Sequence, residues 1–248
     1  MNSISNIRAI TKRELGGYFS SPVAYVFIVI FLLLTGFFTF MAGGFFERGQ
    51  ASLENSFFVW HPWLYLFLVP AAGMRLWAEE RRVGTLELLL TLPITTWQAI
   101  AGKFLASWLF LLLALVLTFP VVITVNFLGS PDNGVIFAAY VGSFLMAGAY
   151  LAIACMTSAM TRNQVVSFIV SFVICLLLVL CGFPPVTNLL TRWDIPWLVN
   201  TVAAFSVITH FEYFTKGVVD SRDVIFFLSV IGFSLFTTGV IIRSHRAG

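Results

Sequence analysis

Long apolar runs separated by short polar stretches dominate the chain. A helix needs about 20 apolar residues to cross a lipid bilayer, and six segments qualify. They are residues 23–46, 57–77, 104–127, 135–160, 165–183 and 224–242. The pattern predicts an all-α integral membrane protein with six transmembrane helices. Pro62, Pro70 and Pro120 lie within or beside these segments and are expected to kink the helices rather than break them.

Residues 1–22 precede the first apolar run and mix charged and apolar side chains at roughly helical spacing. Arg8, Lys12, Arg13 and Glu14 alternate there with an apolar stripe. The alternation predicts an interfacial helix, with the basic residues at anionic lipid headgroups and the stripe at the acyl boundary. The alternative is a solvated tail that only enforces topology.

The connection between the fifth and sixth segments, residues 184–222, is too long and too apolar for an ordinary loop. Its apolar run 197–208 has 12 residues, which are too few to cross. Trp and Tyr residues around this run predict a re-entrant or interfacial helix on the outer face. A true crossing would place the C-terminus outside, against the distribution of basic residues.

The composition is typical of a membrane protein. Apolar residues make up 59% of the 248 residues and charged residues 10%, whereas roughly a quarter of the residues of a soluble domain are charged. The net charge of +3 is too small to indicate binding to nucleic acid. Cys155, Cys175 and Cys181 lie in apolar runs without a paired spacing. Such cysteines are typically buried and take no part in disulfides or metal sites.

Basic residues are distributed unevenly between the two sides of the predicted bundle. Short cytoplasmic flanks retain positive charge during insertion. With the N-terminus inside, the cytoplasmic side carries ten of the fourteen Lys and Arg residues, namely Arg8, Lys12, Arg13, Arg75, Arg81, Arg82, Lys103, Arg162, Arg243 and Arg246. The outer side carries the other four, Arg48, Arg192, Lys216 and Arg222. The bias predicts a multi-pass membrane protein with both termini in the cytoplasm.

The most charged stretch lies between the second and third segments. Arg75 and Glu79 are four residues apart, and Glu79 and Arg82 are three apart. Both pairs can therefore bridge on one helix face, so that the second span continues as a short charged helix into the cytoplasm. Gly84 then allows a sharp turn.

A second short helix is predicted after that turn. Thr85 can cap it, Glu87 lies in its first turn where the helix dipole favours an acid, and Pro93 ends it. The result is a helix-turn-helix knob with Leu86 available for a hydrophobic groove and Glu80 at its rim. Such a knob is a docking element. The alternative is a charged loop that only anchors topology.

Several kinds of chemistry have no signal in the sequence. Gly102-Lys103 lacks the other residues of a phosphate loop, and Lys103 is expected to be an anchor at a membrane boundary. His61, His210 and His245 are too far apart in sequence to indicate a metal site. An ion-coupled carrier usually needs a charged residue near the middle of a span. The predicted spans have none there. A machine driven from outside the bilayer is therefore favoured.

A family resemblance rests on residues 79–94, Glu-Glu-Arg-Arg-Val-Gly-Thr-Leu-Glu-Leu-Leu-Leu-Thr-Leu-Pro-Ile. This stretch resembles the cytoplasmic signature of ABC-2 type transporter permeases. Arg13 and Glu14, followed by the aromatic-rich residues 17–22, resemble the elbow helix that opens them. Residues 210–224 resemble the outer segment of the short gliding-motility-type branch. The resemblance implies one transmembrane domain over residues 23–248, preceded by the elbow helix in residues 1–22.

The resemblance also implies a function. The chain would be half of a dimeric pore, a homodimer or a dimer with a related permease, paired with two copies of a cytoplasmic ABC ATPase. ATP and Mg²⁺ would bind only in that partner, no cofactor would bind in this chain, and a periplasmic or membrane accessory subunit could join. The coupling residues would be Glu79, Glu80, Gly84, Thr85, Leu86, Glu87 and Pro93. The complex would lie in the bacterial inner membrane and export, extract or transmit force across it. The rival hypothesis is a membrane-embedded enzyme or assembly factor without an ATPase.

Overall fold

The computed structural model describes residues 3–49, 51–86, 94–191 and 201–244, and these parts contain helices and no strand. In chain order the helices are α1 (Ser3–Phe19), α2 (Pro22–Phe37), the π-helix η1 (Phe38–Ala42), α3 (Phe45–Arg48), the 3-10 helix η2 (Phe58–Trp60), α4 (His61–Gly73), α5 (Ala78–Val83), α7 (Thr96–Val116), α8 (Phe119–Leu128), α9 (Asn133–Met160), α10 (Gln164–Leu180), α11 (Pro184–Thr191), α13 (Val207–Thr215) and α14 (Ser221–Ser244). The predicted all-α class is confirmed for these residues.

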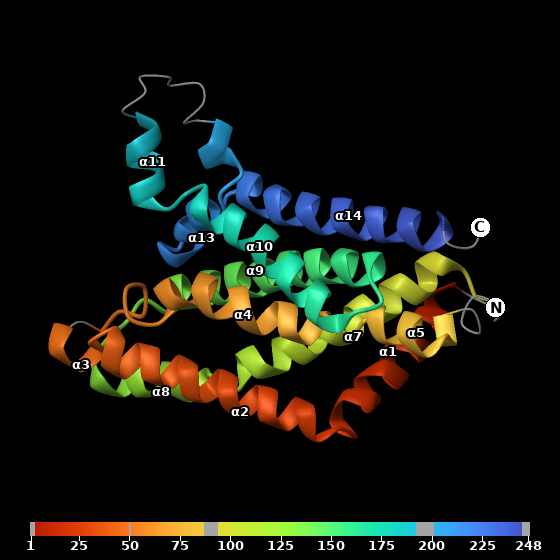
Figure 1. Cartoon of the computed structure of the whole chain (residues 1–248). Helices are drawn as coiled ribbons and strands as arrows, with labels where there is room; N and C mark the ends of the chain where they lie inside the picture. Colours follow the sequence, from red (N-terminus) through yellow and green to blue (C-terminus); the bar gives the residue numbers. More distant parts are fainter. Residues whose placement is uncertain (1–2, 50, 87–93, 192–200, 245–248) are drawn as a thin grey trace.

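Helix α9 is the centre of the bundle. It packs against α4, α7, α10, α13 and α14 (Figure 1), and most of its residues are buried. Small residues allow this close packing. At Gly148, for example, an added Cβ would lie 2.7 Å from the Trp108 ring of α7. The small residues of the fourth apolar segment therefore serve packing inside one chain.

Four of the six predicted spans are long and apolar enough to cross a membrane: Pro22–Glu47, Thr96–Leu128, Asn133–Met160 and Ser221–Ser244. The second of these bends at Leu117–Thr118, where α8 starts with Pro120 in its first turn.

The second and fifth predicted spans are helical but shorter than expected. Helix α4 has 13 residues and α10 has 17, or roughly 20 and 25 Å at 1.5 Å per residue. The bilayer core is about 30 Å thick. A 3-10 helix precedes α4, and a turn at residues 74–77 follows it. The sequence predicts that the second span continues as a charged helix. In the structure the turn at residues 74–77 separates the two helices.

The predicted N-terminal helix forms as α1, and it lies along the first half of α7. Arg8, Lys12 and Arg13 are exposed. The apolar stripe, however, is partly used inside the protein: Tyr18 stacks on Phe110 of α7 with the ring centroids 4.9 Å apart. The stripe is thus not wholly free to enter a membrane, and this part of the prediction is corrected.

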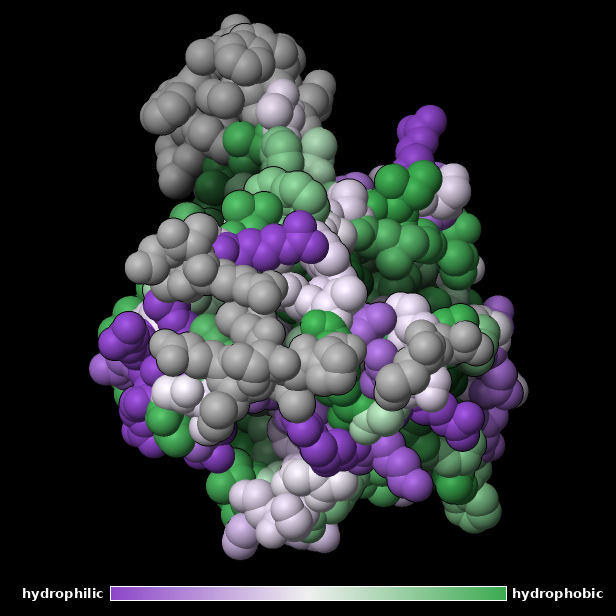
Figure 2. Space-filling model, turned by 90° about the vertical axis from the view of Figure 1, so that its right-hand side faces the viewer, coloured by the Kyte–Doolittle hydropathy of each residue, from purple (hydrophilic) through white to green (hydrophobic). Residues whose placement is uncertain are grey.

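The two ends of the bundle differ in character. The start of α1, the end of α14 and α5 lie at one end, which we call the α5 end, and α3, α11 and α13 lie at the other, the α13 end (Figure 1). Figure 2 views the molecule from the α5 end, where hydrophilic residues form a broken band across the face. The predicted outer helix 197–208 lies partly outside the described residues. Within them α11 and α13 occupy the connection.

Candidate functional site

The junction between α4 and α5 is fixed to the central helix by one buried hydroxyl. The backbone N–H groups of Trp77 and Ala78 both donate to Ser158 Oγ of α9, each over 3.0 Å. Ser158 Oγ in turn donates to the carbonyl of Met74 over 2.9 Å. These bonds satisfy amide groups that the turn at residues 74–77 would otherwise leave unpaired. The start of α5 is therefore held in one position on α9.

Two side chains strengthen this attachment. Trp77 is fully buried, and its indole N–H donates to Cys155 Sγ over 3.2 Å. Arg81, in the last turn of α5, donates from Nη1 to the carbonyl of Ala159 at the end of α9. Because both residues bind the same end of α9, the short helix α5 cannot move without moving that end.

A buried ion cluster joins α5 to two further helices. Lys103 Nζ of α7 lies 2.8 Å from Glu80 Oε1 of α5 and 3.3 Å from Glu14 Oε2 of α1. The side chain of Lys103 is 6% exposed, and those of Glu14 and Glu80 are 23% and 20% exposed. The ammonium also lies over the Trp77 ring, 5.5 Å from its centroid. We call Glu14, Glu80 and Lys103 the Lys103 cluster.

Burial and charge act in opposite directions on Glu14. Burial disfavours its carboxylate, but Lys103, and to a smaller extent Arg13, lower its pKa below the ordinary value. Nearby, burial raises the pKa of Tyr18 to about 12, and its hydroxyl pairs with Ser107 of α7 over 2.8 Å. Glu14 is thus ionised at neutral pH, and a neutral phenol lies beside it.

The exposed face of α5 is open and mostly polar. Glu79, Arg82 and Val83 are exposed, and Gly84 ends α5 in the left-handed conformation with φ of 80°. The predicted turn at Gly84 is therefore confirmed. Any protein bound at the α5 end could contact this face.

The second half of the predicted knob is only partly visible. Thr85 is exposed, Leu86 is buried and both are helical, so Thr85 lies inside the next helix rather than capping it. Glu87 and Pro93 lie outside the described residues, and their predicted roles stay predictions.

Two ion-pair predictions for this segment are wrong in detail. Among the described residues, neither Arg75–Glu79 nor Glu79–Arg82 forms an ion pair, and Glu80 pairs with Lys103 instead. Lys103 itself is not a boundary anchor, because α7 starts at Thr96 and buries it about two turns into the helix. The structure therefore joins Glu14 of the predicted elbow to Glu80 of the predicted coupling segment through a lysine that was expected only to anchor a membrane boundary.

The α13 end has its own polar groups. His210 Nδ1 lies 2.6 Å from Asp223 Oδ1, and Nε2 donates to the Ala204 carbonyl over 3.1 Å. His210 thus pairs with Asp223, and Glu212 faces Lys216 at 3.7 Å. This pair ties α13 to the start of α14. No group of three potential metal ligands occurs in the described parts of the chain.

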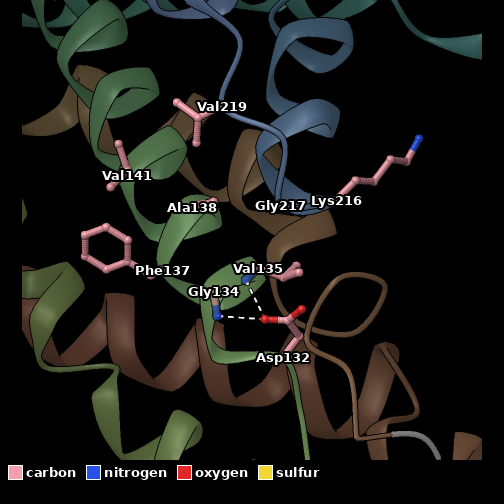
Figure 3. Close-up of a pocket in the computed structure, with 9 residues that line it drawn as sticks. All are labelled: Asp132, Gly134, Val135, Phe137, Ala138, Val141, Lys216, Gly217 and Val219. Carbon is pink, nitrogen blue, oxygen red and sulfur yellow. Dashed lines mark hydrogen bonds between the residues drawn. The ribbon is translucent and has the colours of Figure 1, made fainter.

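A pocket of about 510 Å³ also opens at the α13 end, between the start of α9 and the end of α13 (Figure 3). One oxygen of Asp132 accepts hydrogen bonds from the backbone amides of Gly134 and Val135. Lys216 points away from the other residues of the pocket. Asp132 is therefore engaged in capping α9, and the Lys216 side chain does not face the pocket.

Comparison with known proteins identifies the family. A model of the ABC-2 family transporter proteins matches residues 64–220, which is more than half of the chain and includes α5, the central helix and the residues between α10 and α14. No curated protein matches the chain. The chain belongs to the ABC-2 family of transporter proteins.

Proposed function

We propose that this chain is the membrane subunit of an ATP-driven transporter and that α5, with the segment that follows it, is the element on which a cytoplasmic ATPase acts. Members of the family lack a nucleotide-binding domain, and the family implies an ATPase partner. One observation carries the proposal: α5 has exposed charged side chains, while its other side is bonded to α7 and α9 and, through Lys103, to α1.

Force applied to α5 would spread through these bonds. Ser158 and Arg81 connect it to α9, the helix against which five others pack. The Lys103 cluster connects it to α7 and α1. Closure of the ATPase would therefore tilt α9, α7 and α1 together. Packed helices shift as units, because a close-packed core does not deform continuously.

The membrane arrangement that fits this role has six crossings with both termini in the cytoplasm. The even number agrees with the start of α1 and the end of α14 at the same end of the bundle (Figure 1). In this arrangement α4 and α10 cross with the help of adjoining residues, and α1 lies at the cytoplasmic surface as an elbow helix. Two copies, or one copy and a related permease, would pair with two ATPase subunits that hold ATP and Mg²⁺.

The turn at Gly84 gives a test with a matched control. Gly84 and Gly49 both have positive φ, 80° and 60°, and an added Cβ would meet nothing within 4 Å at either position. Alanine in the left-handed region costs about 1–2 kcal/mol at each. We expect Gly84→Ala to lower the amount of ATPase that co-purifies with the chain, and Gly49→Ala, at the α13 end, to leave it unchanged. Equal effects of the two variants would contradict the role of the Gly84 turn.

Topology is tested by thiol labelling in a background without the three native cysteines. Val219→Cys, at the α13 end, should react with an impermeant reagent in intact cells, because Val219 is exposed. Arg82→Cys, at the α5 end, should react only after the membrane is opened. Labelling of Arg82→Cys in intact cells would reverse the assignment of sides.

A further inference from the structure

A cleft of about 540 Å³ opens beside the Lys103 cluster, between α1 and α2 on one side and α4, α5 and α7 on the other. Its volume lies within the range of sites for small organic molecules, about 300–1,000 Å³. One end of the cleft is charged and the other is apolar. This polarity is the feature that distinguishes it from the other cavities described.

The charged end carries groups of both signs with unused bonding capacity. Arg75 is exposed and borders the cleft, and it has no ion-pair partner among the described residues. Glu79 borders the cleft and is exposed as well. Oε2 of Glu80 is buried without a hydrogen-bond partner, although Oε1 pairs with Lys103. A buried carboxylate oxygen without a partner is costly, so this atom favours a ligand that brings a donor.

The apolar end follows α2 into the bundle. Val23, Val26 and Ile30 of α2 border it and are about half exposed. Leu68 and Ala72 of α4 border it from the other side. From residue 23 to residue 30 the wall is about 10 Å long, at 1.5 Å per residue. An alkyl chain fits such a wall, because both sides of it are apolar.

Two other cavities of similar volume lack this combination. The pocket of Figure 3 has its Asp132 carboxylate used in helix capping and its Lys216 directed away. A groove of about 550 Å³ between α7, α8 and α9 is bordered mainly by residues such as Leu112, Phe119 and Phe144, and by no charged side chain.

We propose that the cleft binds an amphiphile whose headgroup carries both a phosphate and an ammonium, with its alkyl chain between α2 and α4. The phosphate pairs with Arg75, because a guanidinium matches a phosphate with two parallel hydrogen bonds. The ammonium donates to Oε2 of Glu80 and lies near Glu79. This proposal rests on the proposed function for one step: with the α5 end in the cytoplasm, the cleft takes its ligand from the cytoplasmic leaflet.

The ligand site and the proposed transmission element share residues. Glu80 belongs both to the cleft and to the Lys103 cluster, and Glu79 lies on α5 itself. Movement of α5 would therefore change the charged end of the cleft. In this way the ATPase could alter the affinity for the amphiphile without touching it.

The experiment uses the purified full chain without any ATPase and a photoactivatable phosphoethanolamine lipid as the probe. We expect Arg75→Gln to lower labelling about tenfold through loss of the charged hydrogen bonds. Ile30→Trp should lower it similarly by filling the apolar end. Leu33→Trp is the control, since Leu33 is an exposed residue of the same helix that does not border the cleft. It should leave labelling unchanged.

A second probe tests the headgroup. The matching phosphoglycerol lipid keeps the phosphate and lacks the ammonium, and we expect it to label the chain several-fold less. Equal labelling by both probes, or equal labelling of Ile30→Trp and Leu33→Trp, would overturn the proposal. If a second copy of the chain fills the cleft instead, Ile30→Trp should change the oligomeric state, and the probe should label all variants weakly. This result would also overturn the proposal. Because no ATPase is present, failure here leaves the docking role of α5 untouched.

Discussion

Replacing Lys103 with methionine is expected to destabilise the chain more than any other single change at the α5 end. The substitution removes the only cation between the Glu14 and Glu80 carboxylates in the described cluster, whose nitrogen lies 3.3 and 2.8 Å from them. Breaking a buried ion pair by removing one partner costs about 3–5 kcal/mol. Partial exposure of the two glutamates places the expected cost at the lower end of that range. Thermal unfolding in detergent measures it.

Controls for Lys103→Met separate charge from packing. Lys103→Arg keeps the positive charge and should unfold at a temperature close to that of the unchanged chain. The triple variant Lys103→Met, Glu14→Gln, Glu80→Gln removes all three charges and should recover most of the loss, because no uncompensated charge stays buried. If the triple variant is as unstable as Lys103→Met alone, the cost arises from lost packing and not from the ion cluster.

Replacing Ser158 with alanine is expected to loosen α5 from the central helix. The change leaves the Trp77 and Ala78 amides and the Met74 carbonyl without their partner. Both amide residues are buried. A buried donor without an acceptor costs about 1–3 kcal/mol, and the turn at residues 74–77 would rearrange to recover its bonds. We expect a lower unfolding temperature and ATP hydrolysis in the complex that no longer depends on the state of the membrane subunit.

Ser229→Ala is the matched control for Ser158→Ala. Ser229 is exposed on α14, and its hydroxyl donates to the carbonyl of Phe226 in the same helix. Alanine there removes a local bond and leaves no buried amide unpaired. A comparable effect of the two substitutions would show that Ser158 is an ordinary helix serine and that α5 is held by other contacts.

The helices themselves could be predicted from the sequence because lipid imposes a simple pattern. Each of the six long apolar runs contains a helix, four of them long and apolar enough to cross a membrane. The Gly84 turn followed from residue type. Lengths were less predictable. Helix α4 starts at His61 and ends at Gly73, although the apolar run extends from 57 to 77, because hydropathy does not report where a 3-10 helix or a turn replaces the α-helix.

The contacts of the candidate site could not be predicted. Glu80 was expected at an exposed rim, and it pairs with a lysine of α7, which also binds Glu14, 89 residues away along the chain. The spacing along the helix predicted ion pairs of Glu79 with Arg75 and Arg82 instead. Ser158 gave no signal, because a serine in an apolar helix usually bonds to its own backbone. Such partners depend on how α1, α5, α7 and α9 meet, and periodicity along one helix carries no information about that.

Photo-crosslinking from α5 tests most directly the claim that a cytoplasmic ATPase acts on this element. A photoreactive amino acid at position 83 replaces Val83, which is 64% exposed beside Gly84, and the control position is Val219, which is 56% exposed at the α13 end. After irradiation of intact cells, we expect the Val83 position to form an adduct that mass spectrometry identifies as an ATPase with a phosphate loop, and the Val219 position to form none. Absence of that ATPase from the Val83 adducts, with the complex present in the same cells, would contradict the account.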